Sequence, residues 1–185
     1  MAGFVFFEKS PRHVSLDQAR VLGAVAHGRI TKVALVVDAA DDAISAITHA
    51  LRPDMLQLHG HEGPLRIADI RRRFGLPVIR AFGISTSDDL ARAAAGDADI
   101  TLFDAKPPAG ARHPGGNGNA FDWNILARAQ IDRPWILSGG LDPGNVARAI
   151  ALSGATTVDV SSGVESAPGV KHLARIAAFV AAAKA

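Results

Sequence analysis

Short apolar runs alternate with amphipathic segments along the whole chain. Each run is nearly continuous in aliphatic, β-branched or aromatic residues, which is typical of strands buried on both faces of a parallel sheet. The seven runs predict strands at residues 3–7, 33–38, 55–59, 78–82, 100–104, 135–137 and 157–160.

The segments between and after these runs place apolar residues three and four positions apart, which predicts helices. Ser15, Ser87 and Pro143 stand near helix starts as capping signals. A strand followed by a helix, repeated with no linker and no shift in composition, predicts one α/β domain over residues 1–185. The predicted helices span residues 16–27, 42–51, 64–74, 87–95, 122–129, 145–152 and 171–184.

Two architectures fit this order of elements, a closed (β/α)8 TIM barrel and an open doubly wound sheet. One unit averages about 26 residues, so eight units would need about 210, the small end of the barrel range. Turns of small residues follow both of the last two predicted strands, where barrels commonly hold a substrate phosphate. The pattern therefore favours a barrel with only seven visible β-α units, its first strand and helix missing before Met1.

These two turns have the composition of an anion site. Small residues let a ligand approach the backbone closely, and the N–H groups there suit a dianion such as phosphate. Tight turns without any ligand would also account for the glycines. The predicted phosphate-binding residues are Gly139 and Gly140 in the first turn and Ser161, Ser162 and Gly163 in the second.

Composition excludes several classes of function. The hydrophobic share is 48%, yet no apolar run approaches the roughly 18 residues of a membrane span. A formal charge of only +2 is no nucleic-acid signature, and the absence of Cys excludes disulfides and thiolate sites within these residues. The N-terminal residues lack the pattern of a signal peptide, so we expect a cytoplasmic protein that contacts neither membrane nor nucleic acid.

Charged and polar residues at the ends of the predicted strands are candidates for chemistry. Asp104 ends the run 100–104, where a carboxyl would act as a general acid or simply cap the next loop. Asp159 lies within the last predicted strand, where a charge is costly unless it is partnered or used. His59 ends the run 55–59 and would donate to a ligand or make a structural hydrogen bond.

Several motifs together resemble one enzyme family. GFVFFEKSPRHVS, MLQLHGHE, LFDAK, GGNGNAFDW, LSGGLDPGNV and VDVSSGVESAPG occur in this order from Gly3 to the C-terminal region. This series is similar to the phosphoribosylanthranilate isomerases of tryptophan biosynthesis. The resemblance implies a single (β/α)8 barrel and an Amadori rearrangement of a phosphorylated sugar-anthranilate substrate to 1-(2-carboxyphenylamino)-1-deoxyribulose 5-phosphate, without cofactor or metal.

The resemblance also assigns roles to particular residues. It places Asp104 at the general-acid position and Arg12 at a substrate-binding position, where a guanidinium would pair with the anthranilate carboxylate; on the residues alone, Arg12 equally fits a solvated basic loop. From their positions in the predicted strands, and not from the resemblance, His59 and Asp159 are further substrate-binding candidates. The glycine-rich loop within residues 106–120 fits a lid over the site.

One departure from the family concerns the base. The family carries a cysteine base in a Lys-Ile-Cys-Gly motif on its first strand, whereas this sequence begins about where the second strand would and contains no Cys. We therefore expect the chain as written to be truncated and to lack turnover. Two alternatives stay open: a catalytically dead phosphate-binding barrel fragment, and another phosphate-sugar barrel enzyme such as a synthase or aldolase. The oligomeric state is open.

Overall fold

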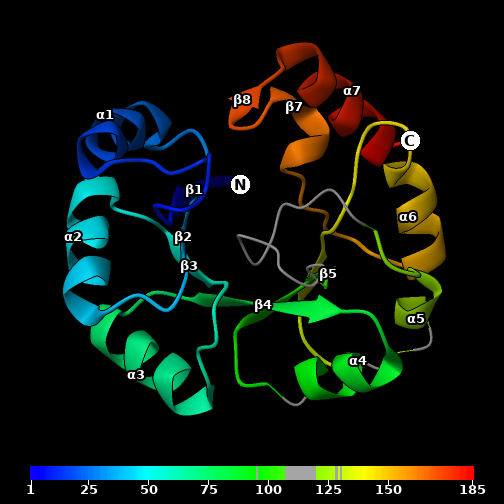
Figure 1. Ribbon diagram of the computed structural model, residues 1–185, viewed down its shortest axis with the longest axis horizontal. Coiled ribbons are helices and arrows are strands. Elements are labelled where there is room, and N and C mark those ends of the chain that lie inside the picture. Colours follow the sequence, from blue (N-terminus) through cyan, green and yellow to red (C-terminus); the bar gives the residue numbers. More distant parts are fainter. Residues whose placement is uncertain (95, 107–119, 128, 130) are drawn as a thin grey trace. The chain divides into compact units, whose positions relative to one another are not determined.

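The computed structural model describes residues 1–94, 96–106, 120–127, 129 and 131–185 (Figure 1). Two compact units are present. Unit 1 comprises Met1–Ala81 and Asp97–Asp99, and unit 2 comprises Phe82–Gly96 and Ile100–Ala185. Strand β4 runs from unit 1 into unit 2, and six parallel strands follow one another in sequence order from β1 to β6.

Unit 1 is built from parallel strands joined by helices. Strand β1 pairs with β2, β2 with β3, and β3 with β4, all in parallel register. Each helix connects two neighbouring strands, as the sequence pattern predicts. The elements are β1 (Ala2–Phe6), α1 (Leu16–Ala26), β2 (Lys32–Val36), α2 (Asp41–Leu51), β3 (Met55–Leu58), α3 (Pro64–Phe74) and β4 (Val78–Ile84).

Local signals explain where the helices of unit 1 begin and end. Ser15 caps α1, because its side chain accepts from the Gln18 backbone N–H while the Gln18 side chain accepts from the Ser15 N–H. Helix α3 begins with Pro64 and ends at Gly75, which adopts a left-handed φ of 65°. These are the features that place a helix boundary within one or two residues.

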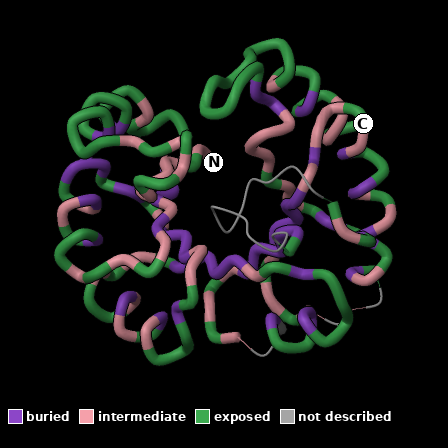
Figure 2. The backbone as a smooth tube through the Cα atoms, viewed as in Figure 1, coloured by how far each residue is buried: buried purple, intermediate pink, exposed green. Residues whose placement is uncertain are grey.

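The core of unit 1 lies between its strands and its helices. Buried residues concentrate along the strands and on the helix faces that meet them (Figure 2). Helix α2 contributes Ile44 and Ile47, and strands β2 and β3 contribute residues without solvent exposure. Those strand residues are Ala34, Val36, Leu56 and Leu58.

Unit 2 continues the alternation with shorter elements. Strand β5 pairs with β6 in parallel register, and Lys106 donates from its backbone to Ile84 at the end of β4. A core around Phe103, Leu137 and Val146 joins the strands to the helices. The elements after β4 are α4 (Ser87–Ala94), β5 (Ile100–Ala105), α5 (Asn124–Ala127), β6 (Trp135–Leu137), α6 (Val146–Ser153), η1 (Ser162–Val164), β7 (Glu165–Ala167), β8 (Val170–Lys171) and α7 (Leu173–Ala183).

Two features of unit 2 differ from the sequence prediction. The predicted strand 157–160 forms only an isolated parallel bridge between Leu137 and Val158, because ladder pairing with β6 does not extend beyond it. A hairpin of β7 and β8 follows it and was not predicted, since strands of two or three residues carry no readable periodicity.

The predicted lid over residues 107–119 lies outside the described residues. No helix in the described part of the chain is long and apolar enough to cross a membrane.

Candidate active site

Asp104 occupies the position that the sequence predicts for an acid, near the C-terminal end of β5. Five of the six residues of this strand are buried, and Asp104 itself is 5% exposed. Its Oδ1 accepts a hydrogen bond from the Ala105 backbone N–H at 2.8 Å. The strand therefore holds a buried carboxyl in a fixed place, as proton transfer requires.

The first glycine turn lies directly against Asp104. Gly139 adopts a φ of 92°, and a Cβ at this position would lie 2.5 Å from the Ala105 nitrogen and 3.1 Å from Asp104 Oδ1. Gly140 follows with a φ of 62°. Only a residue without a side chain fits between the turn and β5, so the sequence brings backbone and carboxyl together.

Asp159 also meets this turn. Its Oδ2 accepts from Ser138 Oγ at 3.1 Å, and its backbone N–H donates to the Leu137 carbonyl at 2.8 Å. Ser138 in turn donates from its backbone to the Phe103 carbonyl at 2.8 Å. Asp159 is exposed and stands just past the isolated bridge, so the prediction that it lies inside a strand was wrong.

The second turn packs against the chain that leaves the first. A Cβ on Gly163 would lie 1.9 Å from the Leu141 carbonyl oxygen, so glycine is required here by close approach. Ser161 is held from the other side by Lys171, whose Nζ donates to the Ser161 carbonyl at 2.8 Å. Lys171 Nζ also lies 2.9 Å from Glu165 Oε1. The unpredicted hairpin thus fixes the second turn.

The two turns together offer backbone donors at one place in unit 2. In the described part of the chain, the N–H groups of Gly139, Gly140, Ser162 and Gly163 donate to no other backbone or side-chain group. Ser162 opens η1, whose first N–H groups have no partner within the helix. Such N–H donors can bind an anionic group, and a buried carboxyl beside them can protonate a neighbouring atom.

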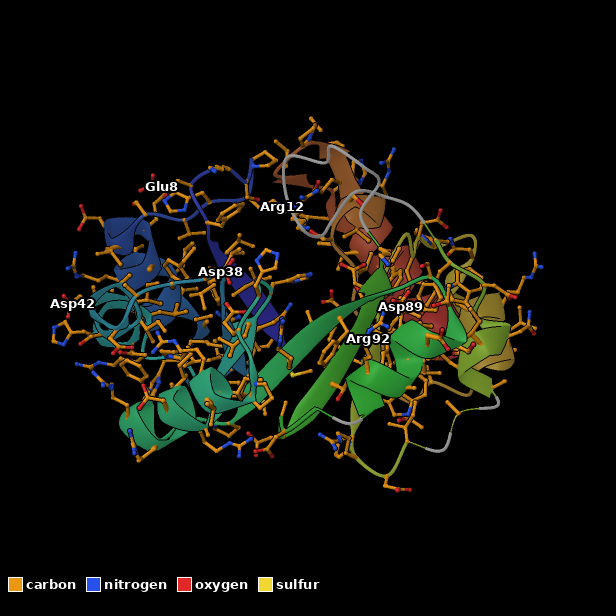
Figure 3. All side chains as sticks on the ribbon, turned by 60° about the horizontal axis from the view of Figure 1, so that its bottom comes forward. Glu8, Arg12, Asp38, Asp42, Asp89 and Arg92 are labelled. Carbon is orange, nitrogen blue, oxygen red and sulfur yellow. The ribbon has the colours of Figure 1, made fainter. Side chains whose placement is uncertain are left out.

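Arg12 and His59 lie at strand ends in unit 1. Arg12 stands in the turn after β1 (Figure 3), where its N–H donates to Ser10 Oγ at 3.2 Å. The His59 backbone donates to the Val36 carbonyl at 3.0 Å, and the His59 ring Nδ1 lies 3.2 Å from Gln57 Nε2. His59 is half-buried and held by its neighbours.

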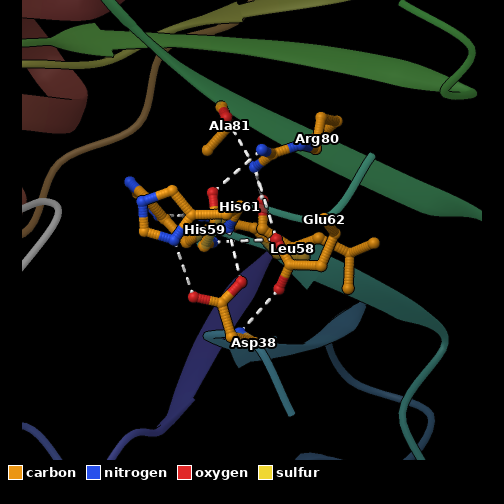
Figure 4. A network of polar contacts seen from close by, with 9 residues as sticks. Asp38, Leu58, His59, His61, Glu62, Arg80 and Ala81 are labelled. Atoms are coloured by element: carbon orange, nitrogen blue, oxygen red, sulfur yellow. Dashed lines mark hydrogen bonds and ion pairs between the residues drawn. The ribbon is translucent and has the colours of Figure 1, made fainter. Parts of the chain in front are cut away.

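A charged network in unit 1 was not predicted as part of the site (Figure 4). Glu62 accepts from the backbone N–H of Asp38 at 2.8 Å and of Gly60 at 2.9 Å. The Arg80 guanidinium donates to the Leu58 carbonyl at 3.1 Å and to the Gly60 carbonyl at 2.9 Å, and it lies 3.5 Å from Glu62. This network fixes the segment on either side of His59.

The network also sets the electrostatics at this end of unit 1. Partial burial opposes the charged form of Asp38, but hydrogen bonds from the His61 backbone and ring, with the charges of His61 and Arg80, hold the pKa of Asp38 below its usual range. Burial lowers the pKa of Arg80, against the charges of Glu62 and Asp38. A signal for this network was readable, because Arg80 stands inside an apolar run and a buried charge needs a partner.

The family model described as N-(5'-phosphoribosyl)anthranilate (PRA) isomerase matches residues 1–182. A relative named N-(5'-phosphoribosyl)anthranilate isomerase from Cereibacter sphaeroides is 53% identical over 184 residues, covering 98% of this chain and 87% of the relative. One from Beijerinckia indica is 55% identical over 186 residues, covering 100% of this chain and 84% of the relative. The chain belongs to the N-(5'-phosphoribosyl)anthranilate isomerase family.

Solved structures of this family share the fold. The phosphoribosyl anthranilate isomerase of Thermotoga maritima superposes with a TM-score of 0.85 at 34% identity, covering 98% of this chain and 86% of that one. A complex of such an isomerase with reduced 1-(o-carboxyphenylamino)-1-deoxyribulose 5-phosphate superposes with a TM-score of 0.82 at 33% identity, with the same coverage. The predicted fold class, a (β/α)8 TIM barrel, is confirmed.

Proposed function

We propose that this chain carries the isomerase site of its family with Asp104 as the general acid. The observation that carries the proposal is the contact between the buried Asp104 carboxyl and the Gly139 turn. The reaction is the Amadori rearrangement of N-(5'-phosphoribosyl)anthranilate in tryptophan biosynthesis. The location we propose is the cytoplasm, where amino-acid precursors are made and consumed.

The acid has a defined task in this rearrangement. Asp104 donates a proton to the ring oxygen of the phosphoribosyl group, the bond from that oxygen to the anomeric carbon breaks, and the nitrogen lone pair forms an iminium. A base then removes the proton on the adjacent carbon, which gives an enolamine and, after tautomerisation, the aminoketose. A positioned acid typically contributes about 10²- to 10⁴-fold to the rate of such a step.

The substrate phosphate is assigned to the two turns of unit 2. Backbone N–H groups of Gly139, Gly140, Ser162 and Gly163 provide donors without a side chain in the way. Ser161 contributes to the same turn, and its orientation is held by Lys171. Because the Gly139 turn contacts Asp104, we infer that the phosphate lies on the ribose side of the reacting atoms.

The remaining candidates receive substrate-binding roles. The Arg12 guanidinium suits the anthranilate carboxylate, because its paired donors match the two carboxylate oxygens. His59 offers a ring nitrogen at a strand end, and Asp159 offers a carboxylate that accepts from Ser138 Oγ. We infer that these residues contact the anthranilate and ribose portions of the ligand.

The proton on the adjacent carbon must be removed by a base. These 185 residues include no Cys, so they do not supply the cysteine base of the family. Turnover is therefore tested in a version of the chain that carries an added strand of the Lys-Ile-Cys-Gly type before Met1, called the extended version. A catalytically inert phosphate-binding module is the second candidate, and the same lack of Cys favours it. Binding of the substrate without turnover by the extended version would support that second function.

Replacing Asp104 tests the proposal. In the extended version, Asp104→Asn should lower kcat by about 10²- to 10⁴-fold and leave affinity for the reduced product analogue within a few-fold, because the amide keeps the shape and loses the proton. Asp142→Asn, in the loop after the first turn, is the matched control for one lost carboxylate and should retain kcat. Turnover near that of the extended parent protein would show that the acid lies elsewhere.

A further inference from the structure

A cavity of about 430 Å³ lies between α1 and α2 in unit 1. It opens beside Lys32, the first residue of β2, and therefore at the opposite ends of the strands from the network around Glu62. No residue assigned above to the isomerase site lines it. Its lining residues are Arg20, Gly23, Ala24, His27, Lys32, His49, Ala50, Leu51 and Arg52.

The polar lining of this cavity is entirely basic. Two arginines, one lysine and two histidines line it, and no acidic side chain does. Two acidic groups bind lining residues from outside the lining: Asp17 pairs with Arg20 while exposed to solvent, and Asp54 accepts from the Lys32 backbone N–H at 2.7 Å. The Lys32 ammonium and the Arg52 guanidinium are left without a carboxylate partner among the described residues. The cavity therefore carries a net positive charge.

Lys32 is the residue that makes this a built site. Its side chain is buried, with the residue only 3% exposed, and its Nζ donates to the Leu51 carbonyl at 3.1 Å. An ammonium has three donors, and burial of an incompletely satisfied charge is costly. Within the described residues, Nζ has this one hydrogen bond, so two donors are available to a ligand.

Arg52 adds a second cation whose backbone is committed to the turn. It adopts a left-handed φ of 49° and ends α2 by donating its N–H to the Thr48 carbonyl at 3.0 Å. In the part of the chain that the structure describes, its guanidinium makes no hydrogen bond or ion pair. A residue other than Gly in this conformation is strained, so an asparagine would suit the backbone better.

Helix ends alone do not account for this cluster. Helices α1 and α2 both end beside the cavity, and the partial negative charge of their last carbonyls favours nearby cations. Those carbonyls use only one of the three Lys32 donors and none of the Arg52 donors. The surplus of donors over acceptors is what an anion would satisfy.

We propose that this cavity binds a compact polyanion of the phosphate type, such as a pyrophosphate or the phosphoryl groups of a larger ester. Arginine and lysine together recognise phosphate oxygens by paired and point-charge contacts. The cluster of lining cations with surplus donors suits an anion that carries more than one charge, and the cavity volume exceeds that of a single small ion. The site is separate from the catalytic turns and does not rest on their assignment.

The test is a calorimetric titration of the 185-residue chain with inorganic pyrophosphate at low ionic strength. Arg52→Asn should weaken binding at least about tenfold, because it removes the cation and keeps the left-handed turn. Arg72→Asn on α3 is the matched control, since its side chain is 80% exposed and outside the cavity, and should bind as the unaltered chain does. Equal affinity in the two variants would overturn the proposal, as would the absence of binding in the unaltered chain.

Two further measurements locate the bound anion. The ring resonances of His27 and His49 should shift on adding pyrophosphate, while that of His172 on unit 2 should not. Ser162→Asp, which places a negative charge in the catalytic phosphate turn, should leave these shifts unchanged. Shifts that disappear in Ser162→Asp would assign pyrophosphate to the catalytic turns and sink the second site. Lys32→Met should abolish the shifts if it folds, and Arg52→Asn decides the matter if it does not.

Discussion

The segments next to the strand ends are stabilised by different interactions in the two units. In unit 1 the segments after β2 and β3 are held by charged side chains, with Glu62 and Arg80 at the centre (Figure 4). In unit 2 the segments after β6 and before β7 are turns of glycine and serine that pack backbone against backbone. In unit 1 the polar groups bind one another, whereas in unit 2 the backbone N–H groups of the turns can bind a ligand.

This difference has a physical basis. A buried ion pair is costly to desolvate, but it fixes the positions of the two charged side chains. It therefore suits a segment that must keep one conformation. A glycine turn brings donors close to a ligand at little steric cost, but offers no side chain to hold itself. Unit 2 meets that need from outside the turns, through Lys171 on Ser161 and Ser138 on Asp159.

Removing one partner of the unit 1 network should produce the largest loss of stability. Glu62→Ala leaves the Arg80 guanidinium buried without its carboxylate and strips acceptors from the N–H groups of Asp38 and Gly60. We expect the free energy of unfolding to fall by about 3 to 5 kcal/mol. Urea unfolding of the 185-residue chain measures it.

Two variants make this result specific. Asp17→Ala removes an exposed carboxylate that pairs with Arg20, and should change the free energy of unfolding by less than about 1 kcal/mol. Glu62→Leu combined with Arg80→Met should recover part of the loss, since it replaces the ion pair by apolar packing. A loss no larger for Glu62→Ala than for Asp17→Ala would contradict the role given to the network.

The glycine turns of unit 2 should respond to steric change instead of charge. Gly163→Ala puts a Cβ against the Leu141 carbonyl, so the two turns must separate. Overpacking of this kind costs about 1 to 3 kcal/mol in unfolding free energy. Affinity for the reduced product analogue should fall as well, because the backbone donors move with the turn.

Gly3→Ala is the matched control, since its Cβ would meet no atom within 4 Å. It should leave both the free energy of unfolding and ligand affinity nearly unchanged.

The comparison between units predicts a further contrast. Glu62→Ala should lower stability more than affinity, and Gly163→Ala should lower both. Unchanged affinity in Gly163→Ala would remove the second turn from the phosphate site.

Much of the fold was readable because burial on both faces leaves a plain pattern. The runs that became β1 to β6 were each predicted within about two residues, and the capping signal at Ser15 marked a helix start correctly. The run at 157–160 has the same pattern but pairs at a single bridge. Apolar composition reports burial, and it does not report how many hydrogen bonds a neighbouring strand will supply.

The candidate site was readable to a smaller extent. Asp104, Gly139 and Gly163 follow from their positions after apolar runs. The structure brings the first turn against the Asp104 carboxyl, and the second turn against the chain that leaves the first. Ser138 and Lys171 were missed, because their roles depend on a bridge and a hairpin too short to leave a pattern. Arg80 signals a buried charge that needs a partner, but its carboxylate was missed because Glu62 lies 18 residues from Arg80 and 24 from Asp38 in sequence.

The smallest expected effect concerns a carboxylate of unit 2 that serves the fold and not the ligand. Asp89 lies in the first turn of α4, near Arg92 (Figure 3). Its Oδ2 accepts from Ser85 Oγ at 2.8 Å and from the Ser85 N–H at 3.0 Å, and Lys106 lies 3.5 Å away. The Ser85 hydroxyl is the main cause that holds the pKa of Asp89 far below its usual range, with burial opposing it.

The pH dependence of stability follows from the sign of this shift. A pKa lower in the folded than in the unfolded chain adds stability that is complete above the unfolded value of about 3.9 and is lost as pH falls through the folded value. Asp89→Asn should therefore cost about 1 kcal/mol of unfolding free energy at pH 7, the usual loss for a helix cap, and progressively less below about pH 4. Asp88→Asn, at the exposed neighbour in the same first turn, is the matched control for the loss of one carboxylate. Urea unfolding of both variants between pH 3 and 7 checks the prediction, and a difference between wild type and Asp89→Asn that does not shrink toward pH 3 would mean that Asp89 stabilises α4 by shape and not by charge.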